Sequence, residues 1–157
     1  MTVKLIGGLL FGLSGVIMSV SYRRFQQRKL TTVDGFISLI FYIKGQIECF
    51  SRPRSDILST LPAEVFCACN CPHGAATLEE LVDASRIYLD EEALRLVSSF
   101  ASEFGSTFRD EQLRRCDHYA NALLEERRLL FTSVNSKIRA GGALWICACL
   151  GIIILLW

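Results

Sequence analysis

The hydrophobic and polar positions divide the chain into two uncharged runs and a charged middle. The first run, residues 5–22, is LIGGLLFGLSGVIMSVSY, and the second, residues 140–157, is AGGALWICACLGIIILLW. As a helix with about 1.5 Å of rise per residue, each run is roughly 27 Å long, close to the hydrocarbon thickness of a bilayer. A core helix of this length in a small domain should show a polar face, and the second run shows none. We therefore predict transmembrane helices in residues 1–22 and 140–157.

A cleaved signal peptide is the competing interpretation of the first run, with SVS at residues 19–21 as a small-x-small cleavage site. Only Lys4 and the amino terminus carry a charge before the run, whereas Arg23 and Arg24 follow it directly. Basic residues on that side oppose export. An uncleaved anchor is therefore the favoured interpretation.

The flanking charges predict the topology. All 16 acidic residues lie between the two runs, and basic residues stand at both edges of this middle segment: Arg23, Arg24, Arg28, Lys29, Lys137 and Arg139. Because positive flanks stay in the cytoplasm, we expect residues 23–139 to form a cytoplasmic domain and both termini to face outward. The seven cysteines fit a reducing compartment, since their number is odd and their spacing is not that of a secreted disulfide scaffold.

The middle segment has the periodicity of amphipathic helices. Apolar residues recur at steps of three and four, and no strand-like alternation occurs. The two stripes are Phe36, Leu39, Ile40, Ile43, Ile47 and Phe50, and then Ala93, Val97, Phe100 and Phe104. The first of these helices begins near Thr31 or continues from the first span. The predicted fold class is an all-α membrane protein, with N-terminal and C-terminal transmembrane helices flanking a cytoplasmic helical bundle.

Local signals place the helix boundaries. Pro53 and Pro62 interrupt the helical pattern on either side of a short helix. Thr77 and Glu80 have the spacing of a capping box at the start of another helix. Beyond it, Asp90 is expected to cap a third helix.

The last helix is expected to be continuous from a cap at Thr107 to Trp157, because this stretch contains no proline. Its positions at alternating steps of three and four resemble a heptad seam that Arg127 interrupts. Packing against the helix's own domain is favoured over a dimer seam. The seam positions are Leu113, Cys116, Ala120, Leu123, Arg127, Leu130 and Val134.

Two glycines of the first run, Gly8 and Gly12, form a GxxxG motif. Small residues at this spacing allow close approach of membrane helices. They are the candidate membrane-helix packing residues, with the second span as one possible neighbour.

The segment CACNCPH, residues 67–73, gathers potential zinc ligands. Zinc sites use C-x2-C pairs with a second pair a dozen or more residues away, and the alternating pattern here lacks that geometry. We expect small buried hydrophobic side chains at the end of a short helix and no metal or other cofactor. In an alternative interpretation, the chain is a membrane-anchored regulatory protein that senses redox state or metal through Cys67, Cys69 and Cys71.

No catalytic constellation emerges from the sequence. Cys116 and His118 are nucleophile and base types, but residues two apart on a helix point to different faces. No GxxxxGK[ST] loop is present, and the scattered, balanced charges argue against nucleic acid. We therefore expect a non-enzymatic docking or scaffold protein.

The arrangement of the whole chain resembles the stage III sporulation protein AB family of endospore-forming bacteria. The resemblance rests on the opening KLIGGLLFG, the arginine-rich SYRRFQQRKL, the proline-marked SRPRSDILSTLP, and FASEFGSTFRDEQL at residues 100–113. The long helix into the terminal span, with Gly142 and Gly151, completes it. The chain departs from the family's pattern at two places. The family often has an Asp near the position of Phe108, and Asp110 is only a shifted substitute for it. The segment CACNCPH is not part of the family's pattern.

The resemblance implies a function. The family belongs to a secretion-like complex between mother cell and forespore, and its cytoplasmic domain is similar to that of the type II secretion platform protein F. The implied partners are the cytoplasmic ATPase of that complex and its other membrane subunits. The implied location is the mother-cell membrane around the forespore. Gly105, Asp110 and Gln112 are the candidate partner-contact residues, because they hold or approximate the family's spacing.

Overall fold

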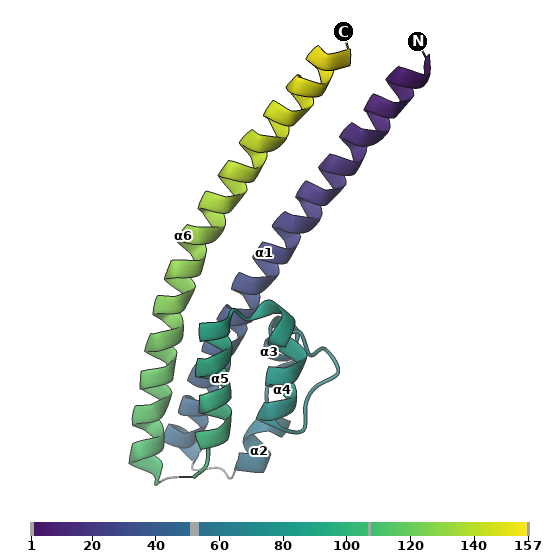
Figure 1. Ribbon diagram of the computed structural model, residues 1–157. Coiled ribbons are helices and arrows are strands. Elements are labelled where there is room, and N and C mark those ends of the chain that lie inside the picture. The colour runs from purple at the N-terminus through teal and green to yellow at the C-terminus, as the bar shows by residue number, and fades with distance from the viewer. Residues whose placement is uncertain (1, 51–53, 107, 157) are drawn as a thin grey trace. The chain divides into compact units, whose positions relative to one another are not determined.

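The computed structural model is built from helices, and no strand occurs in the backbone that it describes, which covers residues 2–50, 54–106 and 108–156 (Figure 1). Side chains are described for residues 14–49, 57–106, 108–134 and 136. The all-α class expected from the sequence is confirmed for these residues.

Two long helices and several short ones make up the described chain. In order, they are α1 (Thr2–Phe50), α2 (Arg54–Ser59), α3 (Ala63–Ala68), α4 (Leu78–Ser85), the 3-10 helix η1 (Arg86–Tyr88), α5 (Glu91–Glu103) and α6 (Arg109–Leu156). The open question about the first helix is resolved, because α1 continues without a break through residues 23–32. The long last helix is also confirmed, with its start at Arg109; the predicted cap, Thr107, lies outside the described residues.

The chain divides into two compact units. The first consists of residues 1–27 and 131–157, and the second, which we call the domain, consists of residues 28–130. The runs predicted as spans belong to the first unit, and most of their side chains, with Gly8 and Gly12, lie outside the described residues. In the part of the chain that the structure describes, no helix combines the length and the apolarity needed to cross a membrane.

The core of the domain is apolar, with buried side chains from α1, α2, α4, α5 and α6 and partly buried ones from α3 packed against them. On α1, the described side chains of the predicted stripe are buried, with Phe36, Ile40 and Ile43 at most 1% exposed, and Val33 and Ile37, which were not predicted, are buried as well. The side chain of Phe50 lies outside the described residues. The stripe of α5 is also confirmed, since Ala93, Val97, Phe100 and Phe104 are all buried. This burial supplies the main stabilisation of the domain, at about 25 cal/mol per Å² of apolar surface.

The seam on α6 packs inside the domain, as the favoured interpretation expected. Cys116, Ala120 and Leu123 are at most 1% exposed and belong to the same core cluster as the α1 stripe. Arg127, the polar interruption, is about half exposed and forms a bidentate ion pair with Asp34 of α1. The charge of this seam residue is therefore paired at the edge of the seam and is not buried in the core.

The caps agree with the sequence in position and differ in detail. The Thr77 hydroxyl accepts a hydrogen bond from the Glu80 amide at 3.2 Å, while the Glu80 carboxylate accepts from the amide of Ala76, one residue before the expected donor. Asp90 occupies the N-cap position of α5, but its side chain makes no capping bond. It pairs with Lys29 of α1 instead.

Candidate functional site

The turn between α5 and α6 contains the residues predicted to contact a partner. Gly105 has φ of +82°, the left-handed conformation expected where α5 ends. Its amide donates a hydrogen bond to Oε1 of Gln112 at 3.2 Å. The backbone amide of Gln112 donates a hydrogen bond to the Phe108 carbonyl at 2.9 Å, which closes the first turn of α6. The spacing of Gly105 and Gln112 therefore has a local cause: one side chain holds the end of α5 against the start of α6.

The three predicted contact residues have different environments. Gln112 is only 5% exposed, so its side chain serves the turn from inside the domain. Gly105 and Asp110 are exposed, and Asp110 lies in the first turn of α6, where a carboxylate favours the positive end of the helix dipole. Two of the three residues are thus available to a partner, and the third shapes the surface that they occupy.

Phe108 is the residue of this turn that sequence reasoning missed. Its side chain is 92% exposed, the largest exposed fraction among the large apolar side chains described. The only signal in the sequence was an aromatic residue placed directly before the charged triplet Arg-Asp-Glu at residues 109–111. We call the exposed residues Gly105, Ser106, Phe108 and Asp110 the turn surface.

Contacts on both sides hold the turn in place. The Arg109 guanidinium donates to the Glu48 carbonyl at 2.6 Å, which ties the start of α6 to the end of α1. Arg115 bonds to Glu103 of α5 at 2.8 Å. Beneath this pair, Tyr119 packs edge-on against Phe100 with ring centroids 5.6 Å apart, and burial raises the pKa of the Tyr119 phenol. These contacts therefore hold the residues of the turn surface in position.

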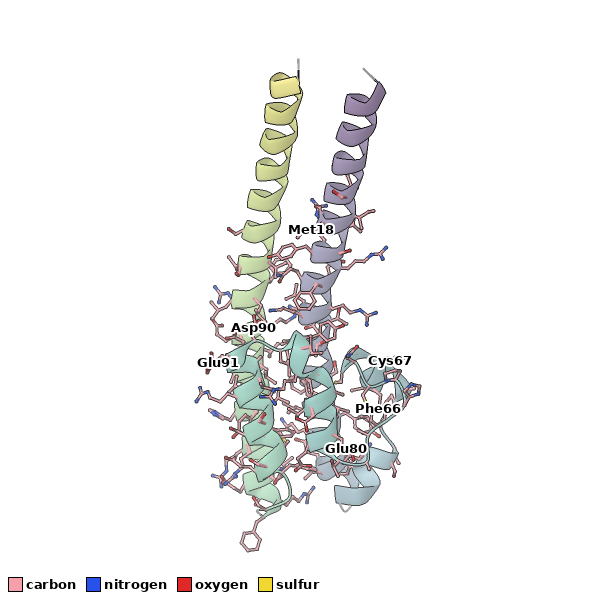
Figure 2. All side chains as sticks on the ribbon, turned by 45° about the vertical axis from the view of Figure 1, so that its right-hand side comes forward. Met18, Phe66, Cys67, Glu80, Asp90 and Glu91 are labelled. Carbon is pink, nitrogen blue, oxygen red and sulfur yellow. The ribbon has the colours of Figure 1, made fainter. Side chains whose placement is uncertain are left out.

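The cysteine segment serves a structural role at its centre. Cys69 is fully buried, and burial, with a smaller effect from Cys71, raises the pKa of its thiol to about 12. Cys67 is exposed (Figure 2), and the Cys71 thiol is partly buried and donates to the Gly74 carbonyl at 3.1 Å. Within the described residues, no three His, Cys, Asp or Glu side chains are grouped so as to hold a metal ion. The expectation of small buried hydrophobic side chains is confirmed for Cys69 and is wrong for Cys67, which is exposed because it lies near the C-terminal end of the short helix α3, none of whose residues is fully buried.

The backbone explains why the segment after α3 turns as it does. Asn70 has φ of +57°, and the amides of Asn70 and Cys71 donate to the carbonyls of Cys67 and Phe66, as in a Schellman motif. Nδ2 of Asn70 donates to the Ala84 carbonyl at 3.3 Å. The buried Ser85 hydroxyl bonds to the carbonyl of Cys69. The end of α3 is thereby joined to α4 by polar contacts.

Gly35 allows the same segment to approach α1. A Cβ atom at Gly35 would lie 2.9 Å from the backbone carbon and from Cβ of Ala68, and 3.0 Å from the amide nitrogen of Cys69. These distances are shorter than van der Waals contact, so only glycine fits here without a shift of the backbone. The close approach buries the end of α3 against α1.

The other cysteine considered from the sequence lies in surroundings that disfavour its thiolate. Cys116 is fully buried, and burial, followed by the charge of Asp117, raises its pKa to about 11. His118 is exposed and packs edge-on against Tyr119. The two side chains face different surroundings, as the helical spacing predicted. A thiol with a raised pKa carries little of the reactive thiolate at neutral pH.

The fold defines the class of this chain as an all-α protein with a helical bundle. The chain matches no protein-family model, no curated protein and no solved structure.

Proposed function

We propose that the chain is a non-enzymatic platform subunit that docks a cytoplasmic ATPase at the mother-cell membrane around the forespore, within a sporulation-specific secretion-like complex. This proposal includes membership of the stage III sporulation protein AB family and a multi-pass arrangement with the domain in the cytoplasm. The partners are the ATPase, other membrane subunits of the complex and the membrane itself.

The composition of the two units supports membrane attachment. Every acidic residue of the chain belongs to the domain, residues 28–130, whereas residues 1–27 and 131–157 contain none. The uncharged runs 5–22 and 140–157 also belong to the first unit. The charged residues that favour water thus concentrate in one unit, and the apolar runs in the other. α1 and α6 each contribute residues to both.

The observation that carries the docking proposal is the exposure of Phe108 on a turn that is fixed from both sides. A large aromatic side chain left in water is unfavourable for an isolated domain. Aromatic side chains that become fully covered are frequent hot spots of protein interfaces. Two charged residues that follow it in the sequence, Asp110 and Arg114, are exposed, and polar side chains of this kind form the rim of protein interfaces. The domain therefore offers an anchor for a protein partner.

Replacing Phe108 tests this proposal. In sporulating cells, the full chain carrying a purification tag should recover an ATPase whose peptides contain a P-loop. F108S should reduce that recovery at least about tenfold, because removal of a hot-spot side chain costs 2 kcal/mol or more of binding free energy. The control is I87S, since Ile87 of η1 is 72% exposed and lies outside the turn surface.

Both variants should keep the unfolding temperature of the parent, because neither side chain is buried. Unchanged recovery with F108S, or equal loss with I87S, would contradict docking through the turn surface. Absence of any P-loop ATPase from the purified material would contradict the platform function itself.

The sensor alternative requires Cys67, Cys69 and Cys71 to react together. The burial of Cys69 opposes this, because its thiolate is scarce at neutral pH. We expect a thiol reagent to label Cys67 quickly and Cys69 at least about a hundredfold more slowly, as located by peptide mass spectrometry. Comparable rates at both positions would favour the sensor.

A further inference from the structure

Residues 14–27 of α1 have their apolar side chains on the outside. The exposed fractions are 63% for Val16, 60% for Ile17 and 69% for Met18. Met18 is labelled in Figure 2. The buried positions of the same segment are Gly15 and Gln26, a residue without a side chain and a polar one. A helix in water has the opposite arrangement, with apolar residues buried and polar ones exposed.

The exposed apolar side chains surround most of the helix. At 100° per residue, Gly15 and Gln26 lie within about 20° of each other, on one narrow stripe. Val16, Val20, Ile17 and Met18 are spread over roughly 200° of the remaining circumference. A single partner helix covers only one stripe of such a surface, whereas acyl chains surround it. The chemistry that fits this surface is therefore lipid.

Two arginines follow this apolar surface directly. Arg23 and Arg24 are exposed, and they point to different sides of the helix because consecutive residues differ by about 100°. They lie roughly 5–10 Å along the helix axis from Val20 and Ile17, about the distance from acyl chains to the headgroup phosphate. The first unit contains no acidic residue that could neutralise them.

We propose that Arg23 and Arg24, together with the apolar surface of residues 16–20, bind anionic phospholipid, with the guanidinium groups on the headgroup phosphate and the apolar side chains against the acyl chains. The inference rests on the proposed membrane location and adds the lipid class to it. Guanidinium forms paired hydrogen bonds with phosphate, which favours arginine at such a site. The basic residues Lys137 and Arg139, beside the second apolar run, have the same charge.

Lipid competition tests the proposal. The full chain in nonionic detergent is mixed with equal amounts of phosphatidylglycerol and phosphatidylcholine, and bound lipids are counted by native mass spectrometry. The parent should retain phosphatidylglycerol in excess. R23Q/R24Q should lower the ratio of bound phosphatidylglycerol to phosphatidylcholine by about fivefold for each arginine removed. This factor corresponds to the roughly 1 kcal/mol of attraction to anionic lipid that one basic residue contributes.

The control variant is R86Q/R128Q, which removes the same charge from exposed arginines of the domain and should leave the ratio unchanged. Equal losses in the two variants, or no loss with R23Q/R24Q, would overturn the lipid site. Displacement of the bound lipid by millimolar glycerol 3-phosphate would also overturn it, because the acyl chains would then contribute nothing.

The proposed membrane location has its own readout. Alkaline carbonate should leave the full chain in the membrane pellet of expressing cells. A chain that remains in the pellet but shows no lipid preference contradicts only the lipid site. Release of the chain into the supernatant contradicts the membrane location, and the lipid site with it.

Discussion

The two parts of α1 place their apolar side chains in opposite environments. In residues 33–47, the apolar side chains of Val33, Phe36 and Ile43 are buried and Ser38 is exposed. In residues 14–27, apolar side chains are exposed and Gln26 is buried. The helix has the same backbone hydrogen-bonding pattern throughout. The difference therefore lies entirely in what covers the side chains.

Intramolecular packing covers the apolar side chains of the domain part. Short helices α2 to α5, with part of α6, bring their own apolar faces to the same core, and α4 lies beside α5 (Figure 1). In residues 16–20, the side chains of Val16, Ile17 and Met18 are more than half exposed, so their apolar surface calls for an external cover. Mutations that remove apolar atoms should consequently have very different effects in the two parts.

The largest expected contrast comes from two isoleucines of α1. I43A removes a side chain that is fully buried and should lower the free energy of unfolding by about 2–5 kcal/mol. I17A removes a side chain that is 60% exposed and should change it by less than about 0.5 kcal/mol. Unfolding of the full chain in detergent can be followed with a thiol-reactive fluorophore, because Cys69 and Cys116 are buried until the domain opens.

The contrast fails if the two alanine variants unfold at the same denaturant concentration. That result would place Ile17 in a cooperative core with Ile43 and remove the distinction between the two parts of the helix. A second alanine exchange at a buried position, such as L123A on α6, should repeat the large effect.

A smaller contrast comes from two glycines within the domain part of the helix. G35A places a methyl group against the backbone of Ala68 and Cys69 and should cost about 1–2 kcal/mol of stability, even after the gain in helix propensity. G45A meets no atom within 4 Å and should stabilise by about 0.5–1 kcal/mol. The same substitution in the same helix is therefore expected to lower the stability where packing is tight and to raise it where space is open. Equal shifts in the unfolding midpoint of both variants would refute the close approach at Gly35.

Local sequence signals were enough for the helices and their stripes. The buried faces of α1 and α5 follow from periodicity, and the start of α4 follows from Thr77. Such features depend on residues within a few positions of one another, so a single sequence contains them. The continuity of α1 was left open, because no proline or capping pattern decides it.

Features that depend on distant residues were not accessible in this way. Asp90 was expected to cap α5, but it pairs with Lys29, which is 61 residues away. Gly35 carries no sign in the sequence that Ala68 approaches it. At the candidate site, Gln112 was expected to contact a partner, but its side chain is buried and accepts a hydrogen bond from Gly105, while the exposure of Phe108 was not predicted. Each of these outcomes is decided by tertiary packing.

The smallest expected effect is a change in the stability of the domain with pH. It distinguishes the two units because acidic side chains occur in only one of them. All Asp and Glu side chains belong to the domain, so the titration of side-chain carboxyl groups in acid takes place there. Glu126 of α6 is partly buried, and burial raises the pKa of its carboxyl, with further contributions from the charges of Glu92 and Asp90. The folded state therefore disfavours the ionised form of this side chain.

The sign of the pH effect follows from linkage. Below the ordinary pKa of about 4.5 the Glu126 carboxyl is neutral in both states, and it has no electrostatic cost. As the pH rises through the raised pKa of the folded state, the group ionises and stability falls, so the cost is fully present at neutral pH. E126Q should therefore stabilise the domain at pH 7 by up to about 0.5 kcal/mol and have no such advantage at pH 4. The control is E125Q, whose exposed carboxylate pairs loosely with Arg128 at 3.8 Å and should show no pH-dependent gain. Denaturant unfolding of the full chain at both pH values measures the difference, and a gain from E126Q that persists at pH 4 would show that packing, rather than charge, is its cause.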